Sequence, residues 1–422
     1  MSTARMTHSD NMYRRNADDS LQSVSSKVDI NTEVFIVGGG PAGLAAAIAA
    51  RQRGFVVTLA DQSQAPIDKA CGEGIMPEGV AALRSLGVEV PYAQYFPFRG
   101  IRFVENSSDV QAAFVGSPGL GVRRTVLHHL LVERAHELGV ILHWGMAVAF
   151  DGSGVYCNGE RVKYDWLIGA DGKRSQMRAW AGLEPLAIRR ERIGIRQHFI
   201  TTSVPEFVEV YWHVRGQAYV TPVGSNEVCV VLIGNQPGMR MNEMWDLFPT
   251  LRERLKDAQN SDKTRGSVSA TLRVRRITRG NLALIGDAAG SIDAITGEGL
   301  SLAFRQAVVL GDALSRGTLA QYDATHRSLE RAPRMMERVL LMMANTNWLR
   351  GRALMALAAC PDMFTHLLAV HTGMLPLRSV GLRPLAAFLL QLLRAGKTDS
   401  SPYSPLRTYR RTQGSRSDES RA

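Results

Sequence analysis

The first strongly apolar run of the chain stops at three consecutive glycines. Residues 33–37 (Glu-Val-Phe-Ile-Val) are typical of a buried parallel strand, and the alanine-rich residues 44–53 beyond the glycines predict a helix. Gly54 ends this helix, and residues 55–60 predict a second strand with Asp61 at its end. The pattern therefore predicts a strand–loop–helix–strand unit that begins a parallel sheet.

Helix and strand patterns continue to residue 395, with one change of character in the middle. Between residues 193 and 234, several short apolar runs indicate an antiparallel sheet inserted into the α/β domain. The other predicted strands span residues 98–115, 140–150, 155–164, 166–170 and 281–285, and the predicted helices span 78–86, 125–138 and 299–314. Beyond residue 320 we predict helices broken at Pro333, Pro361, Pro376 and Pro384.

The glycines after the first strand carry the spacing Gly38-x-Gly40-x-x-Gly43. In a dinucleotide-binding turn, the first glycine permits the tight turn, the second lets the backbone approach a pyrophosphate, and the third lets helix and strand pack closely. The helix that follows presents free N–H groups and a positive dipole end to phosphate. Asp61, about 20 residues further on, is placed to bind the adenosine ribose. The segment therefore predicts dinucleotide binding.

Two later segments contain further residues that could bind such a cofactor. Gly286-Asp287 follows the apolar run 282–285, where a carboxylate at a strand end can bind sugar hydroxyls. Gly297-Glu298-Gly299 opens a helix, whose backbone N–H groups can stabilise charge on an electron-rich ring.

Taken together, these blocks resemble the superfamily of FAD-dependent monooxygenases and geranylgeranyl reductases, the aromatic-hydroxylase type of flavoprotein. Gly121 to Leu127 is similar to its cofactor-contacting arginine segment, with Arg124 the best match, and Asp171-Gly172 is similar to its DG motif. The resemblance spans about residues 33–315 and implies a tightly held FAD. The residues that the motifs and the resemblance assign to FAD are Gly38, Gly40, Ala42, Gly43, Asp61, Arg124, Asp171, Gly172, Gly286, Asp287, Gly297, Glu298 and Gly299.

The resemblance also sets the expected fold: an α/β protein with a doubly wound, Rossmann-like FAD domain, an inserted antiparallel sheet for substrate and a helical C-terminal region. We expect the FAD domain at residues 32–192 and 266–320, the substrate sheet at 193–265 and the helical region at 321–395. The polar segments 1–31 and 396–422 are expected to be disordered.

Two residues are candidates for a catalytic role. Cys71 lies in a Cys-Gly-Glu segment that resembles the stretch passing near the flavin in geranylgeranyl-reductase-like proteins, although free cysteines are more often small buried side chains. His198, on a predicted strand of the substrate sheet, can act as acid or base near neutral pH or can be a structural histidine. Of Tyr211 and Trp212, adjacent on one strand, only one can face a substrate.

Composition narrows the function classes. The 422-residue chain has a net charge of +11, but no nucleic-acid-binding motif accompanies it, so we expect no nucleic-acid partner. Its four cysteines form no CxxC pair, which predicts neither a metal site nor a disulfide framework and fits the reducing cytoplasm. An apolar face at residues 382–393 with Arg383 and Arg394 nearby is more typical of a protein core, and contact with a membrane surface stays open as the alternative.

The resemblance implies several activities. We favour an NAD(P)H-using monooxygenase acting on an apolar small molecule. A flavin-dependent double-bond reductase is the nearest alternative, toward which the Cys-Gly segment leans. A flavin halogenase ranks third, because its Trp-x-Trp-x-x-Pro signature is absent from the sequence. A flavin-binding partner without turnover is the alternative outside the enzymes. The oligomeric state stays open.

Overall fold

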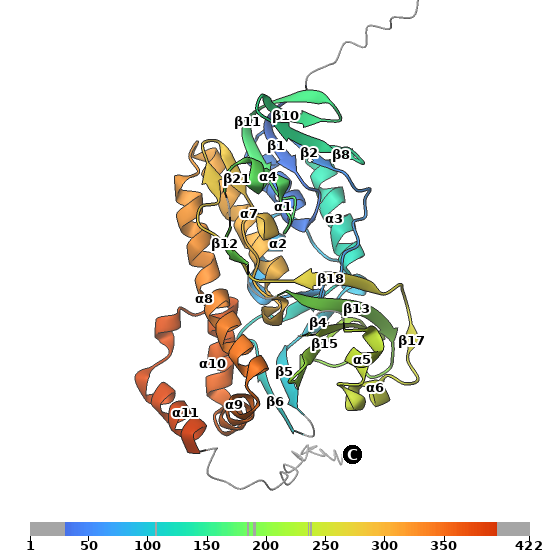
Figure 1. The fold of residues 1–422 in the computed structure, drawn as a ribbon, viewed down its shortest axis with the longest axis vertical. Coiled ribbons are helices and arrows are strands. Elements are labelled where there is room, and N and C mark those ends of the chain that lie inside the picture. The colour runs from blue at the N-terminus through green and yellow to red at the C-terminus, as the bar shows by residue number, and fades with distance from the viewer. Residues whose placement is uncertain are drawn as a thin grey trace, which may run out of the picture.

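The computed structural model describes residues 30–394 except 106–107, 184, 189–190, 235 and 237–238. The segments predicted to be disordered, 1–31 and 396–422, lie outside the described residues apart from Ile30 and Asn31, which already belong to the first strand. The fold class predicted from the sequence is confirmed: a parallel α/β sheet lies at one end of the molecule, and a second sheet and a C-terminal helical region lie side by side at the other (Figure 1).

A mostly parallel sheet forms one end of the molecule. Its strands run in the order β20-β21-β11-β1-β2-β8, and all neighbours are parallel except β20 with β21. The strands are β1 (Ile30–Val37), β2 (Val57–Asp61), β8 (Ile141–Trp144), β11 (Glu160–Gly169), β20 (Thr278–Arg279) and β21 (Leu282–Leu284), with the hairpin β9 (Val148–Asp151) and β10 (Gly154–Cys157) attached to β11.

Helices pack on this sheet and on one another around it. They are α1 (Pro41–Arg51), α2 (Pro77–Ser85), α3 (Arg124–Glu137), α4 (Gln176–Trp180) and α7 (Gly299–Ser315). α1 packs on α7 and α3, and its alanines are small enough to let the helix axes approach closely. Val34, Phe35 and Ile36 of β1 are completely buried beneath them, so the apolar run that predicted a buried strand forms the centre of the core.

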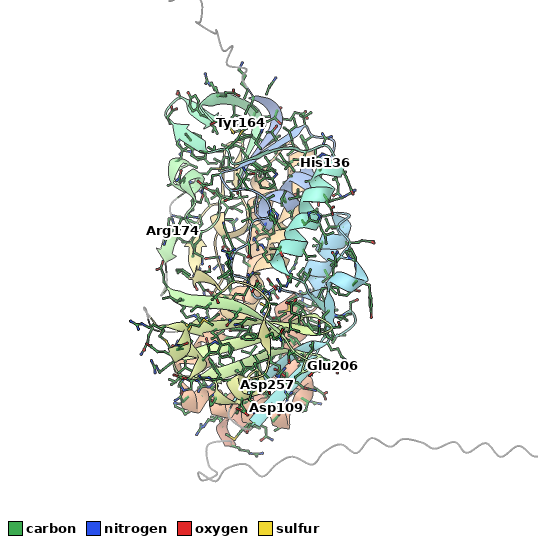
Figure 2. All side chains as sticks on the ribbon, turned by 90° about the vertical axis from the view of Figure 1, so that its right-hand side faces the viewer. Asp109, His136, Tyr164, Arg174, Glu206 and Asp257 are labelled. Carbon is green, nitrogen blue, oxygen red and sulfur yellow. The ribbon has the colours of Figure 1, made fainter. Side chains whose placement is uncertain are left out.

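The second sheet lies at the other end of the molecule, and its strands come from two separate parts of the sequence, residues 100–113 and 192–269. Its order is β17-β13-β16-β15-β14-β5-β6, with β18 beside β13. The strands are β5 (Gly100–Glu105), β6 (Ser108–Ala113), β13 (Arg192–Ile200), β14 (Val208–His213), β15 (Gly216–Gly224), β16 (Glu227–Gly234), β17 (Gln259–Asn260) and β18 (Arg265–Ser269). Figure 2 shows Tyr164 of β11 near one end and Asp109 of β6 near the other.

This sheet reaches beyond the predicted substrate segment 193–265. β5 and β6 come from residues that the sequence analysis placed in the FAD segment, and β14 pairs with β5 in parallel rather than antiparallel orientation. The reason is that a strand pattern identifies a strand but does not say which sheet it joins. Two short helices, α5 (Met241–Trp245) and α6 (Pro249–Arg254), pack on one face of the sheet.

Smaller elements connect the two sheets. β3 (Gly74–Ile75), β7 (Gly119–Gly121) and β4 (Phe96–Phe98) form a three-stranded sheet, and β12 (Pro185–Ile188) pairs with β19 (Leu272–Val274). Two 3₁₀ turns, η2 (Gly286–Ala288) and η3 (Ala294–Thr296), lie between β21 and α7.

The C-terminal region consists of α8 (Ala320–Asn345), α9 (Asn347–Ala359), α10 (Pro361–Thr372) and α11 (Leu382–Arg394). The predicted break at Pro333 is wrong, since α8 continues through it: a proline removes one hydrogen bond and can bend a long packed helix without ending it. Pro361 begins α10 and Pro376 lies between α10 and α11, as predicted, whereas Pro384 lies inside the first turn of α11.

One face of the second sheet packs on these helices, and we call the resulting cluster the apolar layer. It joins side chains of β5, β14, β15 and β16 to Leu340, Met343, Leu354 and Phe364 of α8–α10. Met76 and Ile295, from the loops at the edge of the parallel sheet, belong to the same cluster. The layer therefore extends from the C-terminal helices to the carboxyl edge of the parallel sheet.

Candidate active site

The residues assigned to FAD lie on turns that leave the carboxyl ends of four strands or on helix N-termini beside them. β1, β2, β11 and β21 run parallel, so the turns that follow them meet at one edge of the sheet. In α/β sheets, this edge is where ligands bind.

The glycine turn after β1 has the geometry that its spacing predicts. Gly38 has a φ of +111°, and a Cβ there would lie 2.3 Å from the Ala170 carbonyl oxygen. A Cβ at Gly43 would lie 1.8 Å from the Gly38 oxygen, so helix and strand are in direct contact. At Gly40, by contrast, an added Cβ meets no protein atom within 4 Å. No side chain caps the N-terminus of α1, which leaves its N–H groups free for a phosphate.

Asp61 and a buried histidine fix the shape of this turn. The Asp61 carboxylate accepts hydrogen bonds from the backbone N–H groups of Gly39, at 2.6 Å, and Ser63, at 2.7 Å. Each carboxylate oxygen keeps a lone pair for a sugar hydroxyl. His128 of α3 donates from Nε2 to the Gly39 carbonyl oxygen at 2.8 Å, and burial lowers its pKa, which keeps the ring neutral. The sequence analysis did not identify His128.

The DG and GD motifs are held together by an arginine. Arg178, buried at the start of α4, donates to the carbonyl oxygens of Lys173, at 2.8 Å, and Ala288, at 3.0 Å. Asp171 accepts from the Met177 N–H at 3.1 Å, and its other oxygen is buried without a partner among the described residues. Asp287 is exposed on η2. The two motifs thus form one surface at the strand ends.

The motif before α7 combines two glycines that are open to solvent with one buried acid. Gly297 has a left-handed φ of +67°, and an added Cβ there would lie 3.2 Å from the Met76 side chain. Glu298 is 1% exposed, and burial raises its pKa to about 8, so it is mostly protonated at neutral pH. His371 of α10 approaches it at 3.6 Å, and burial lowers the pKa of this histidine to about 4. The Glu298 side chain therefore lies inside the protein, while Gly297 and Gly299 are at the surface of the turn.

The Cys-Gly-Glu segment faces the first residue of α3. The Cys71 sulfur accepts from the Glu73 N–H at 3.4 Å, and Glu73 Oε1 accepts from the Arg124 N–H at 3.0 Å. Burial raises the pKa of the Cys71 thiol, although the nearby Arg124 opposes this, so Cys71 carries its proton at neutral pH. Glu73 has a φ of 59°, a left-handed conformation that is uncommon for a residue with a side chain. The hydrogen bonds of its carboxylate to the Arg124 N–H and to His198 stabilise this conformation.

His198 lies within an ion-pair cluster of Asp68, Glu73, Arg196, His198 and Asp262, in which Glu73, Arg196 and His198 are fully buried and the two aspartates are partly exposed. Its Nε2 donates to Glu73 Oε2 at 2.6 Å and its Nδ1 to Asp262 Oδ2 at 2.9 Å. Burial alone lowers the pKa of His198, but the two carboxylates outweigh it, so the pKa is raised and the ring is cationic. Arg196 contacts Asp68 at 2.7 Å, Glu73 at 3.2 Å and Asp262 at 3.1 Å. With both nitrogens engaged, His198 has no free atom for a substrate, which favours the structural interpretation.

Sequence reasoning missed Glu73, Arg196 and Asp262. Arg196 was within reach, because it lies two residues before His198 on the same strand and therefore on the same face. No sequence pattern indicated Asp262, because only the tertiary fold brings its loop to His198.

Three buried groups approach one another closely enough to hold a metal. Glu73, His198 and Cys229 each offer an atom within 4.8 Å of the others. The His198 nitrogens are already occupied by carboxylates, and burial raises the pKa of Cys229 well above its ordinary value, which keeps it a thiol. We therefore assign no metal to these residues.

The second sheet offers polar atoms within the apolar layer. Trp212 belongs to this layer while Tyr211 lies on the opposite face, as the period of 2 requires. The Trp212 indole nitrogen and the Gln217 amide nitrogen are buried and have no hydrogen-bond partner among the described residues. Trp212 and Gln217 are opposite one another in register, so these donors share one face.

Comparisons with known proteins agree with this geometry. The sequence matches the FAD binding domain family over residues 31–327. It is 26% identical over 332 residues to a menaquinone reductase of Mycolicibacterium smegmatis, covering 72% of this chain and 81% of that one. It is 26% identical over 345 residues to a hispidin-3-hydroxylase of Neonothopanus nambi, covering 68% and 81%. A flavoprotein/dehydrogenase structure from Cytophaga hutchinsonii shares the fold, with a TM-score of 0.72 and 17% identity, covering 86% and 100%.

The residues present fit the group that this family binds. The uncapped N-terminus of α1 and the open space at Gly40 suit a pyrophosphate, and Asp61 and Asp287 suit sugar hydroxyls. Open space also surrounds Gly72 and Gly299, where an added Cβ would meet no protein atom within 4 Å. The chain belongs to the FAD binding domain family and is a FAD-dependent oxidoreductase by family.

Proposed function

We propose that this chain is a flavin-dependent reductase that saturates a carbon–carbon double bond in an apolar, isoprenoid-like molecule, with NAD(P)H as the electron donor. The observation that carries the proposal is the position of the Cys71 thiol: its sulfur accepts a hydrogen bond from the Glu73 N–H, beside the start of α3, on the segment that the family resemblance places near the flavin. Saturating a double bond requires a proton in addition to an electron pair. A thiol that keeps its proton at neutral pH is suited to supply it.

FAD, when bound and reduced, supplies the electron pair as hydride. The chain's own part is to place the substrate and to hold a proton at the Cys71 sulfur. The Cys71 thiol would give its proton to the carbon that does not receive the hydride, and the resulting thiolate would regain a proton from solvent. Arg124 stabilises that thiolate, because its positive charge lowers the pKa of Cys71.

The apolar layer is the proposed place for the body of the substrate. It begins at Met76, five residues from Cys71, and extends between the second sheet and α8–α10. A related protein is a menaquinone reductase, which fits an apolar substrate of this kind.

A second candidate is the NAD(P)H-using monooxygenase that the sequence analysis favoured. The unpartnered donors of Trp212 and Gln217 favour it, since they suit the oxygen of a phenol ring inside an otherwise apolar site. A related protein is a hispidin-3-hydroxylase.

The deciding experiment compares the two reactions on one preparation. The holoenzyme is reduced anaerobically with NADPH or dithionite, mixed with a polyprenyl quinone, and the flavin spectrum and product mass are recorded. Reoxidation without oxygen supports the reductase when the product is still heavier by two hydrogens after air has returned the quinol ring to the quinone, because ring reduction alone adds the same mass. A product that returns to the starting mass in air shows that only the quinone ring was reduced, and overturns double-bond saturation. A product heavier by one oxygen, formed only in air, overturns it in favour of the monooxygenase. Purified protein without flavin overturns both.

A variant pair tests the role of Cys71. Cys71→Ala should slow the anaerobic reoxidation by about 10²–10⁴-fold while leaving reduction by dithionite unchanged. Cys360→Ala, at a half-buried free cysteine on the α9–α10 junction, is the matched control and should react at the normal rate. An unchanged rate for Cys71→Ala would remove the thiol from the reaction.

A further inference from the structure

We propose that the outer face of α11 docks on a membrane surface that carries anionic lipid. The proposal concerns only the C-terminal helices and holds whichever reaction the flavin performs. It rests on the exposure of one leucine stripe, on the charge around it, and on its connection to the apolar layer.

Helix α11 has apolar residues on two sides, and none of its residues is fully buried. One side, with Leu385, Phe388 and Leu392, is half-buried, and Phe388 and Leu392 pack on the apolar layer. The outward side is exposed: Leu382 is 85%, Leu389 47%, Leu390 51% and Leu393 65% exposed. Spacings of seven, one and three residues place these four leucines on one stripe of the helix.

Such a stripe is unusual on a protein surface that meets only water. Single exposed leucines are ordinary, but a contiguous row on one helix marks an interaction surface. Figure 1 shows α11 as an outlying helix of the C-terminal region, and within the described residues it packs mainly on α9, with a smaller contact to α10. The outward stripe therefore has no cover from the described part of the chain.

The charge around the stripe identifies the kind of partner. Arg383 and Arg394, at the two ends of α11, are its only charged residues. Between residues 347 and 394 the only carboxylate is Asp362, against four arginines besides Arg350, which is buried and pairs with Glu105. On α9, which contacts α11, Trp348 is 63% exposed with the Arg352 guanidinium 4.7 Å from its ring centre. Leucines flanked by arginines and tryptophan are typical of helices that lie in the lipid headgroup region.

The geometry indicates a helix that lies on the membrane and does not cross it. Thirteen residues of helix span about 20 Å, which is shorter than the roughly 30 Å hydrocarbon core. No single helix within residues 30–394, as far as they are described, is long and apolar enough to span a bilayer; α9 and α10 pass that test only as a pair bent by 109°.

The position of α11 connects the membrane to the candidate active site. Its inner side contacts the same apolar layer that contains Met76 and Ile295 at the edge of the parallel sheet. The exposed stripe of α11 is thus joined, through packed apolar side chains, to the residues at the edge of the candidate active site.

The test is flotation of the full-length holoenzyme with vesicles of phosphatidylcholine alone or mixed with phosphatidylglycerol. The wild type should float with the mixed vesicles and much less with phosphatidylcholine alone. The double variant Leu389→Glu/Leu393→Glu should lose at least ten-fold in bound fraction. Arg383→Gln/Arg394→Gln should lose the preference for phosphatidylglycerol, and added salt should have the same effect on the wild type.

The matched control places two glutamates on exposed apolar residues elsewhere. Leu186→Glu/Val115→Glu replaces side chains that are 64% and 51% exposed and should float like the wild type. Flavin absorbance confirms that each variant is folded. Wild-type protein that stays unbound, or a leucine double variant that floats normally, overturns the proposal. A dimer that the leucine variant dissociates, without vesicle binding, also overturns it and assigns the stripe to a second copy of the chain.

Discussion

Replacing Glu73 with glutamine should destabilise the protein by about 3 kcal/mol, because it removes the charge that lies between two fully buried cations, Arg196 and His198. Glu73 is 1% exposed, and its carboxylate lies 2.6 Å from His198 and 3.2 Å from Arg196, which are equally buried. Removing one partner of a buried pair costs roughly 3–5 kcal/mol, since the other charge is left uncompensated in a medium that solvates it poorly. We expect the lower end of that range, because Asp262 still contacts both cations.

The assay is equilibrium unfolding in urea at pH 6, with and without saturating FAD, compared at constant slope. Glu206→Gln is the control for the same chemical change: Glu206 pairs with Arg99 at 3.4 Å, but both side chains are about two-thirds exposed. Figure 2 shows Glu206 near the end of the molecule that holds the second sheet. An exposed pair of this kind contributes roughly 0–1 kcal/mol. If Glu73→Gln loses no more stability than Glu206→Gln, the cluster does not stabilise the fold and our reasoning about it is wrong.

Three further outcomes follow from the site. The pKa of His198 is raised in the fold, so its stabilising contribution is complete below its unfolded pKa of about 6.5 and is lost as pH rises through the folded value. The difference in unfolding free energy between wild type and Glu73→Gln should therefore narrow above the folded pKa. A difference that stays constant with pH would contradict a charged His198. Glu298, whose pKa is raised to about 8, destabilises the fold increasingly between pH 5 and 8, so Glu298→Gln should gain about 3 kcal/mol relative to wild type over that interval in urea titrations; parallel pH profiles would show that this acid is not buried as described. Gly40→Ala should keep the circular dichroism spectrum and thermal stability of the apoprotein yet purify with little flavin, since a Cβ there meets no protein atom but occupies the space of a phosphate; Gly40→Ala protein with full flavin content would refute the placement of the pyrophosphate.

Much of the cofactor side could be predicted from the sequence because its constraints are local. Gly43 must be glycine because of Gly38, five positions before it, and Gly38 has a positive φ that glycine adopts readily; its contact with Ala170, just after the adjacent strand β11, is the one part that the tertiary fold supplies. The apolar run of β1 is continuous because both faces of that strand are covered.

The ion-pair cluster could not be predicted in the same way. Its members lie on three segments far apart in the chain, and only the packing of the second sheet on the Cys-Gly-Glu segment brings Asp68, Arg196 and Asp262 together. The period of a strand places Arg196 and His198 on one face but does not say what that face meets. Pro333 is a comparable case: the sequence signals a break, and the packing of a 26-residue helix overrides it.

The parallel pairing of β14 with β5 limits how this protein can be divided. A fragment cut at residues 193–265 would lack β5 and β6, and the inner strand β14 would then present a row of unpaired backbone groups at a new sheet edge. Val208 and Val210 on that strand are buried in the native fold and would be uncovered. Such a fragment should self-associate through the open edge rather than fold alone. The protein is therefore best regarded as one cooperative folding unit, because the β5–β6 hairpin from the first third of the chain completes its sheet only when β14 has folded beside it.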